Sequence, residues 1–197
     1  DEFKDLKVAK LKNDKIHYES PNSKITFHQL LTHTSGFGYD FHHQTLSYLL
    51  LQGEIADLLD KEGKFLNAPL IEQPGTFWHY GIGIGWLGKS IEKLSGQSLN
   101  DFMTENVFEP LEMHETSFDI SKLGAHRLPN IYAKDEDDGL IDISAFMASP
   151  QIEDFAYGGG GIFSCPKDYA KFLRMFLNKG QVNGKEFLSK KIIMEMT

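Results

Sequence analysis

The sequence has very little cysteine: Cys165 is the single one among 197 residues. One cysteine cannot form a disulfide within the chain, and it cannot supply the paired thiolates of a cysteine-based metal site. The histidines show no H-E-x-x-H or comparable spacing. His42 and His43 are adjacent in the sequence, so in a helix or a strand their side chains point in different directions. We therefore expect no metal site and no cofactor.

The chain also lacks a surplus of positive charge and a long apolar run. Lys and Arg number 20 against 28 Asp and Glu, which gives a net charge of −8. Such a chain repels nucleic-acid phosphates, so we expect no nucleic-acid partner. No apolar run approaches the roughly 20 residues of a membrane-spanning helix. The first residues, Asp1 to Lys4, do not resemble a signal peptide, and cytoplasmic, periplasmic and secreted locations all stay open. The sequence also leaves the oligomeric state open.

Apolar residues make up 41% of the chain, enough to build a core in one ordinary domain. Their spacing, with the capping and turn residues, predicts a mixed α/β chain that is mostly helical. We expect helices over 25–32, 44–61, 84–95 and 99–107, and two more that begin after Pro166 and after Ser189. We also expect hairpin turns at Asn13-Asp14 and Asn183-Gly184 and a short strand at Ile162-Phe163. We expect 119–150 to be a solvated loop, because its acidic run lacks the alternating ligands and the glycine of a calcium loop.

Three serines have neighbours that invite comparison with a catalytic nucleophile. Ser35 follows a short predicted helix and precedes a glycine, where capping explains it equally well. Ser90 and Ser164 each begin a formal S-x-x-K, the spacing that lets a lysine one helical turn away take the hydroxyl proton. The predicted helix of Ser90 turns charged residues to solvent, and Pro166 makes Ser164 a capping residue. We expect a structural role for all three.

Tyr80 lies in a glycine-rich turn, PGTFWHYGI, just before a predicted helix. A tyrosine can act as a general base when nearby cations lower its pKa from about 10. No Lys or Arg lies within eight residues of Tyr80 on either side. From these residues alone, Tyr80 is either an aromatic anchor of the loop or a base whose cation comes from elsewhere in the fold.

Four segments in order resemble the serine β-lactamase-like family, which includes class C β-lactamases, penicillin-binding proteins and related esterases and transesterases. The segments are ITFHQLLTHTSG from Ile25, PGTFWHYGIGIGWLGKSIEKLSGQSL from Pro74, FEPLEMHETSF from Phe108 and GGGGIFSCPKDYAKFLRMFLNKGQVNGKEFLS from Gly158. The resemblance implies a β-lactamase/transpeptidase-like fold. It also implies that residues 1–197 are a single domain, incomplete at both ends, without the N-terminal nucleophile helix and the C-terminal core strands.

Within this family, the resemblance assigns Tyr80 as the catalytic base or its assistant. Class C β-lactamases have Y-x-N at this motif, and the asparagine contacts the amide of the β-lactam side chain. Here the third residue is Ile82, whose side chain cannot hydrogen-bond. The run YGIGIGWLG is more similar to family VIII carboxylesterases and lovastatin-synthase-type acyltransferases. We therefore expect Ile82 to contribute to substrate binding and a small ester, rather than a lactam, to be the substrate.

The family nucleophile is the serine of an S-x-x-K before the LLTHTSG segment, and the residues before Ile25 contain no such motif. The resemblance implies that the complete protein is a serine hydrolase that transfers acyl groups through an acyl-enzyme, and that this chain alone is inactive. The alternatives are a β-lactamase or D-alanyl-D-alanine carboxypeptidase, and a non-catalytic homologue that acts as a binding module.

Overall fold

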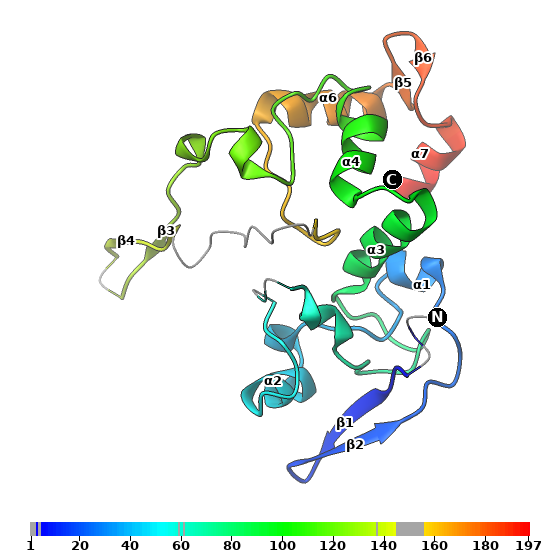
Figure 1. Ribbon diagram of the computed structural model, residues 1–197, viewed down its shortest axis with the longest axis vertical. Coiled ribbons are helices and arrows are strands. Elements are labelled where there is room, and N and C mark those ends of the chain that lie inside the picture. Colours follow the sequence, from blue (N-terminus) through cyan, green and yellow to red (C-terminus); the bar gives the residue numbers. More distant parts are fainter. Residues whose placement is uncertain (1–2, 4, 59, 61, 137, 145–155) are drawn as a thin grey trace. The chain divides into compact units, whose positions relative to one another are not determined.

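The computed structural model describes all residues except 1–2, 4, 59, 61, 137 and 145–155 (Figure 1). The chain divides into two compact units. The first unit comprises Asp1–Leu99 and Ser149–Gly161, and the second comprises Asn100–Ala148 and Ile162–Thr197. Among the described residues, no helix is both long enough and apolar enough to cross a membrane.

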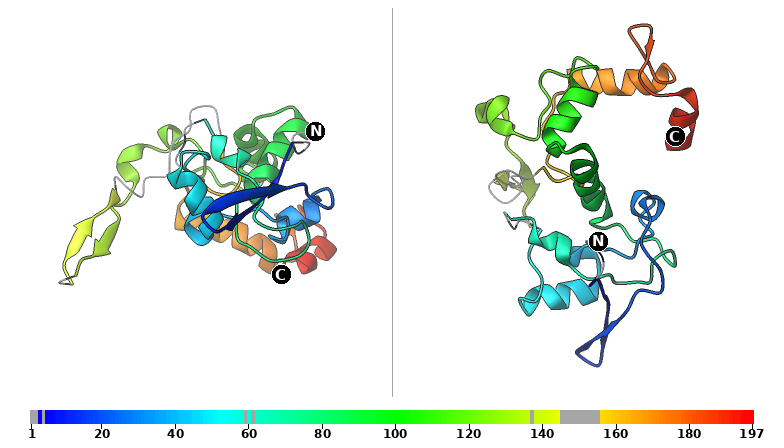
Figure 2. Two further views of the ribbon diagram at one scale, coloured as in Figure 1. Left: turned by 90° about the horizontal axis from the view of Figure 1, so that it is seen from below. Right: turned by 45° about the vertical axis from the view of Figure 1, so that its right-hand side comes forward.

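The first unit begins with an antiparallel hairpin of β1 (Val8–Lys12) and β2 (Lys15–Glu19) (Figures 1 and 2). Asn13 and Asp14 connect the strands with φ angles of 50° and 57°, the conformation of a two-residue turn that matches the twist of the strands. The hairpin expected from this turn is confirmed. Val8 is fully buried and forms a parallel bridge with Leu70, which ties the hairpin to the rest of the unit.

Three α-helices follow: α1 (Phe27–Leu31), α2 (Gln44–Leu51) and α3 (Gly83–Ser95). Thr26 caps α1 in a capping box with Gln29, as its sequence indicates. The helix expected over 44–61 was predicted too long, because α2 ends at Leu51 and Gly53 then adopts a φ of 72°. Short 3-10 turns at Asp40–His42 and Lys64–Asn67 complete the described helical elements of this unit.

The core of the first unit is aliphatic and aromatic. Its fully buried side chains include Val8, Leu30, Phe37, Leu46, Leu49, Leu70 and Ile71. Helix α3 packs here through glycines: a Cβ at Gly85 would lie 2.4 Å from the ring of Tyr157, and one at Gly88 would lie 3.2 Å from the Cα of Gly158. Because these glycines have no side chain, the backbone of α3 can pack directly against the ring of Tyr157 and the backbone of Gly158.

The second unit contains α4 (Leu99–Met103, which starts at the last residue of the first unit), α6 (Pro166–Leu177) and α7 (Lys190–Met196). A π-helical turn, Thr104–Phe108, continues α4, and 3-10 turns lie at Ile120–Lys122 and Ala125–Arg127. Hairpin β5 (Gln181–Val182) and β6 (Lys185–Glu186) separates α6 from α7. These helices and this hairpin agree with the sequence pattern.

Two predictions for the second unit were wrong. Part of the expected loop is a hairpin of β3 (Tyr132–Lys134) and β4 (Leu140–Asp142), seen clearly in Figure 2. Its strands are mostly exposed, so no buried alternation marked them in the sequence. The expected strand at Ile162-Phe163 is reduced to one antiparallel bridge between Ser117 and Phe163.

A buried carboxylate organises the second unit. Asp168 in α6 is 2% exposed. It accepts hydrogen bonds from the Glu115 backbone N–H at 2.7 Å, from the Thr116 hydroxyl at 3.1 Å and from the Lys171 ammonium at 2.9 Å. Burial pushes the pKa of Asp168 upward, but the hydrogen bonds from Lys171, Glu115 and Thr116 outweigh it, and the pKa lies below its ordinary value. The carboxylate is therefore fully partnered and stays ionised.

Candidate active site

Tyr80 belongs to an extended segment that lies against the residues following α1. The Gly75 N–H donates to the Thr34 carbonyl at 2.7 Å, and the His79 N–H donates to the His33 carbonyl at 2.9 Å. His33 has a φ of 55°, an uncommon conformation for a residue with a side chain. Its ring lies 5.0 Å from the ring of Tyr80. Backbone bonds and ring contacts together fix the position of Tyr80.

Gly81 allows the close approach behind Tyr80. A Cβ at this position would lie 2.6 Å from the Gly38 Cα and 2.6 Å from the Phe37 carbonyl oxygen. Both neighbours are backbone atoms that no side-chain rotation can move aside. The chain on either side of Tyr80 is therefore fixed against residues 37–38.

We expect Gly81→Ala to lower the free energy of unfolding by about 1–3 kcal/mol, because the added methyl group overpacks this contact. Urea unfolding measures the loss. Gly160→Ala is the matched control, since its Cβ would meet nothing closer than 3.7 Å. Equal stability of the two variants would contradict the proposed close contact.

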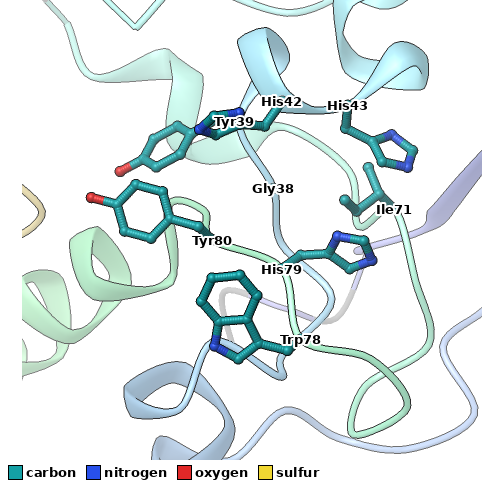
Figure 3. A pocket seen from close by; sticks show the side chains of 8 residues that line it. All are labelled: Gly38, Tyr39, His42, His43, Ile71, Trp78, His79 and Tyr80. Atoms are coloured by element: carbon teal, nitrogen blue, oxygen red, sulfur yellow. The ribbon is translucent and has the colours of Figure 1, made fainter.

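A pocket of about 420 Å³ opens beside Tyr80 (Figure 3). It is lined by Gly38, Tyr39, His42, His43, Ile71, Trp78, His79 and Tyr80. Tyr80 is 46% exposed, whereas Tyr39 is buried, and their rings lie 5.2 Å apart. In Figure 3 the two phenol oxygens lie on the same side of the pocket. Tyr80 is thus the accessible phenol of the pair.

The hydroxyl of Tyr39 is hydrogen-bonded to the hydroxyl of Tyr157 at 2.8 Å. Burial raises the pKa of both phenols, and for Tyr157 the hydrogen bond with Tyr39 raises the pKa further. Both phenols therefore stay protonated near neutral pH. Tyr39 thus presents a neutral ring to the pocket, with its hydroxyl already engaged by Tyr157.

His43 and His79 form the opposite end of the pocket, with ring centroids 5.8 Å apart and planes at 86° (Figure 3). His43 is also the N-cap of α2, since its Nδ1 accepts from the Thr45 backbone N–H at 3.3 Å. Burial lowers the pKa of His43, and the charges of His79 and Lys10 lower it further against the opposing effect of Glu72. Among the described residues that line this pocket, none is Lys, Arg, Asp or Glu.

The two residues singled out by the family motif have different surroundings. Tyr80 lines the pocket, whereas Ile82 is 3% exposed, precedes the first residue of α3 and belongs to the core cluster. Ile82 is not among the described residues lining this pocket. Its role in substrate binding stays a prediction.

Two of the three candidate serines make local hydrogen bonds, and the third is buried. The buried one is Ser35. The Ser90 hydroxyl donates to the Trp86 carbonyl at 2.8 Å, and the Ser164 hydroxyl is hydrogen-bonded to that of Thr116 at 2.8 Å. These contacts agree with the structural roles expected for all three.

Sequence reasoning missed most of the pocket. From the sequence, His42 and His43 are considered only as metal ligands, whereas the structure places both at the pocket, where His42 ends a 3-10 turn and His43 caps the next helix. Trp78 and His79 lie in the same motif as Tyr80 and could have been included on that ground. Among the described residues, no three His, Cys, Asp or Glu side chains are grouped to hold a metal ion.

The chain is similar to known proteins over most of its length. Residues 13–196 match the family model described as Beta-lactamase. The monacolin J acid methylbutanoyltransferase of Aspergillus terreus is 33% identical over 79% of this chain and 38% of its own length. The lovastatin esterase of Penicillium rubens is 29% identical over 81% of this chain and 41% of its own length.

Among solved structures, a mutant of the simvastatin synthase of Aspergillus terreus superposes with a TM-score of 0.82 and 28% identity. The match covers 96% of this chain and 45% of that structure. The β-lactamase/transpeptidase-like fold expected from the sequence is confirmed. The chain spans about two-fifths of the length of the curated relatives it matches.

Proposed function

This chain belongs to the Beta-lactamase family, and from that premise we propose that the complete protein is a serine hydrolase that transfers acyl groups from small esters. The observation that carries the proposal is the position of Tyr80. Its phenol is half exposed at an aromatic pocket, directly before α3, whereas its neighbour Tyr39 is buried and hydrogen-bonded to the partly buried Tyr157. Tyr80 is the phenol best placed to exchange a proton with a substrate.

In the proposed reaction, a serine outside these 197 residues attacks the ester carbonyl carbon. Tyr80 accepts the serine proton and returns it to the departing alcohol, which leaves an acyl-enzyme. An acceptor alcohol or water then attacks the acyl carbon and releases the serine. Hydrogen-bond donors stabilise the oxyanion that forms in this step, and one such donor contributes about 3–4 kcal/mol in other enzymes. In this proposal, the lysine of the family's S-x-x-K, also outside these 197 residues, stabilises the negative charge on the Tyr80 oxygen.

The named relatives support an ester as the substrate. One is a methylbutanoyltransferase and another an esterase; transfer to an alcohol and hydrolysis differ only in what attacks the acyl-enzyme. Ile82 agrees with an ester, since it offers no hydrogen-bonding side chain at the third position of the tyrosine motif.

The choice between ester and lactam is tested on the complete protein with p-nitrophenyl butyrate and nitrocefin. We expect ester cleavage to exceed nitrocefin turnover in kcat/KM by at least about 100-fold, because a hydrogen-bonding side chain that lactam recognition requires is missing, and such a loss costs several kcal/mol. Absorbance assays measure both reactions. Fast nitrocefin turnover without ester cleavage would assign the protein to the β-lactamases instead.

We further propose that the 197-residue chain alone forms no acyl-enzyme. Ser90 and Ser164 are hydrogen-bonded within their own units and Ser35 is buried, so none is an activated nucleophile. Intact mass spectrometry with a fluorophosphonate probe is expected to show no stoichiometric adduct on this chain and one adduct on the complete protein. An adduct mapped to Ser35, Ser90 or Ser164 would refute the proposal.

A further inference from the structure

The pocket beside Tyr80 has two chemically different ends. Tyr39, Trp78 and Tyr80 form an aromatic end, and His43 and His79 form a polar end with Ile71 between them (Figure 3). An apolar ring fits against the aromatic end, whereas the polar end calls for a group that accepts hydrogen bonds. The proposed acyl transfer makes use of Tyr80 alone and leaves this polar end without a function.

The helix cap fixes which nitrogen of His43 carries the hydrogen. Its Nδ1 accepts from the Thr45 backbone N–H at 3.3 Å, so in the neutral ring the hydrogen is on Nε2. A neutral imidazole in this tautomer donates from Nε2 and has no lone pair there for a metal ion. The groups that face His43 electrostatically are His79, Lys10 and Glu72. His43 is therefore a neutral, oriented donor near neutral pH.

The carboxylate that acts on the pKa of His43 is already neutralised by a cation. Glu72 is paired with Lys10 at 2.6 Å, and Lys10 also donates to the Ile71 carbonyl at 2.8 Å. No carboxylate is among the described residues lining the pocket. The perpendicular ring of His79, 5.8 Å from His43, offers a second donor to the same ligand.

We propose that His43 and His79 bind a carboxylate of the substrate, so that the pocket selects an amphiphilic molecule with an apolar ring at the Tyr80 end and a carboxylate at the histidine end. That the bound molecule is a substrate rests on the proposed acyl transfer. That it binds at this site does not, because binding is measured directly. A hydrogen bond to a charged group contributes enough to change affinity by about tenfold or more. His43 and His79 are in this view positioning residues.

The test is an NMR titration at pH 7.5 with 2-naphthylacetate and with 2-(2-naphthyl)ethanol, which has the ring but no charge. The indole N–H of Trp78 reports on the pocket. The indole of Trp86, which donates to the Leu66 carbonyl, is the internal control. We expect the acid to bind about tenfold more tightly than the alcohol, and only the Trp78 signal to move.

Two substitutions at one position separate binding from capping. His43→Asn keeps a good N-cap acceptor but is too short to place a donor where Nε2 lies, so it should weaken the acid about tenfold and the alcohol less than twofold. His43→Gln brings an amide N–H close to that place and should restore part of the preference for the acid. His79→Asn should also weaken the acid selectively, and it leaves the cap untouched.

Any of three results would overturn the proposal: equal affinity of the native protein for the two probes, no binding of either, or an equal loss for both probes in His43→Asn. Thermal unfolding of each variant shows whether the fold persists, and His79→Asn answers the question if His43→Asn does not fold. Because the readout is binding, a protein that binds the acid but transfers no acyl group would refute the proposed function and leave this inference standing.

Discussion

Replacing Tyr80 by Phe in the complete protein is expected to lower kcat for ester cleavage by about 10²–10⁴-fold, the usual contribution of a positioned general acid or base. The substitution removes only the hydroxyl group. The ring contacts with Tyr39 at 5.2 Å and His33 at 5.0 Å remain available to the phenylalanine. KM should change little, because the proton is transferred in the transition state.

Tyr48→Phe is the matched control for this prediction. It removes a phenol hydroxyl from the same unit, one that donates to the Asp14 carbonyl at 3.1 Å and does not line the pocket. We expect this variant to keep its activity. Activity of Tyr80→Phe within threefold of the native protein, measured with p-nitrophenyl butyrate, would assign Tyr80 to a role in the loop.

Asp168→Ala is expected to cost at least about 2 kcal/mol of stability, because each buried hydrogen-bond donor left without an acceptor costs about 1–3 kcal/mol. The substitution leaves three donors without their acceptor: the Glu115 backbone N–H, the Thr116 hydroxyl and the Lys171 ammonium. Asp168→Asn should cost less, because its amide oxygen can still accept one hydrogen bond. Urea unfolding followed by circular dichroism measures both losses.

Glu195→Ala provides the control in the same unit. Its carboxylate lies 4.0 Å from Lys191 on the surface of α7, and an exposed pair at this spacing contributes at most about 0.5 kcal/mol. A loss for Asp168→Ala no larger than that of Glu195→Ala would show that the buried network does not stabilise the fold.

The same carboxylate gives stability a pH dependence of known sign. The pKa of Asp168 is lowered in the folded state, so its contribution is fully present above the unfolded value of about 3.9 and is lost as the pH falls through the folded pKa. The Asp168→Asn variant should therefore lose less stability than the native protein on acidification.

Much of the fold was predictable because its signals are local. Thr26 with Gln29 marks the start of α1, and Asn13-Asp14 marks a hairpin; both signals lie within a few residues of the structure they specify. Periodicity was less reliable beyond Leu51, where Ile55 and Leu58 pack against the core without forming a helix. Apolar spacing records burial, and an irregular segment can be buried as well.

Helix α6 shows a second limit of periodicity. The sequence predicts the helix, with an apolar face of Tyr169, Phe172, Leu173, Phe176 and Leu177. Phe172 and Phe176 do pack against the core of the second unit. The other three side chains are 54%, 46% and 80% exposed, in sequence order, whereas Asp168 and Met175 are buried. The buried carboxylate depends on donors from residues 115 and 116, about fifty positions away. The sequence of the helix alone therefore cannot predict that Asp168 is buried.

The candidate site was predictable only in part, for a related reason. Tyr80 was found from its own turn, and the family resemblance that assigns it a role covers residues that are contiguous in sequence. The pocket around it brings together residues 38–39, 42–43, 71 and 78–80. One of them, Tyr39, is hydrogen-bonded to a residue 118 positions away. Contacts between such distant segments depend on the tertiary fold, so local sequence patterns do not predict them.

The glycines of α3 set a limit on how this protein can be engineered. Replacing helical glycines with alanine is a common route to higher thermal stability, since each glycine in a helix costs up to about 1 kcal/mol. In α3 the same substitution at Gly85 would drive a methyl group into the ring of Tyr157, and at Gly88 into the backbone of Gly158. The glycines that weaken α3 as a helix thus leave room for Tyr157, which is hydrogen-bonded to Tyr39 in the pocket. Any gain in helix stability from alanine would be offset by displacement of these two tyrosines.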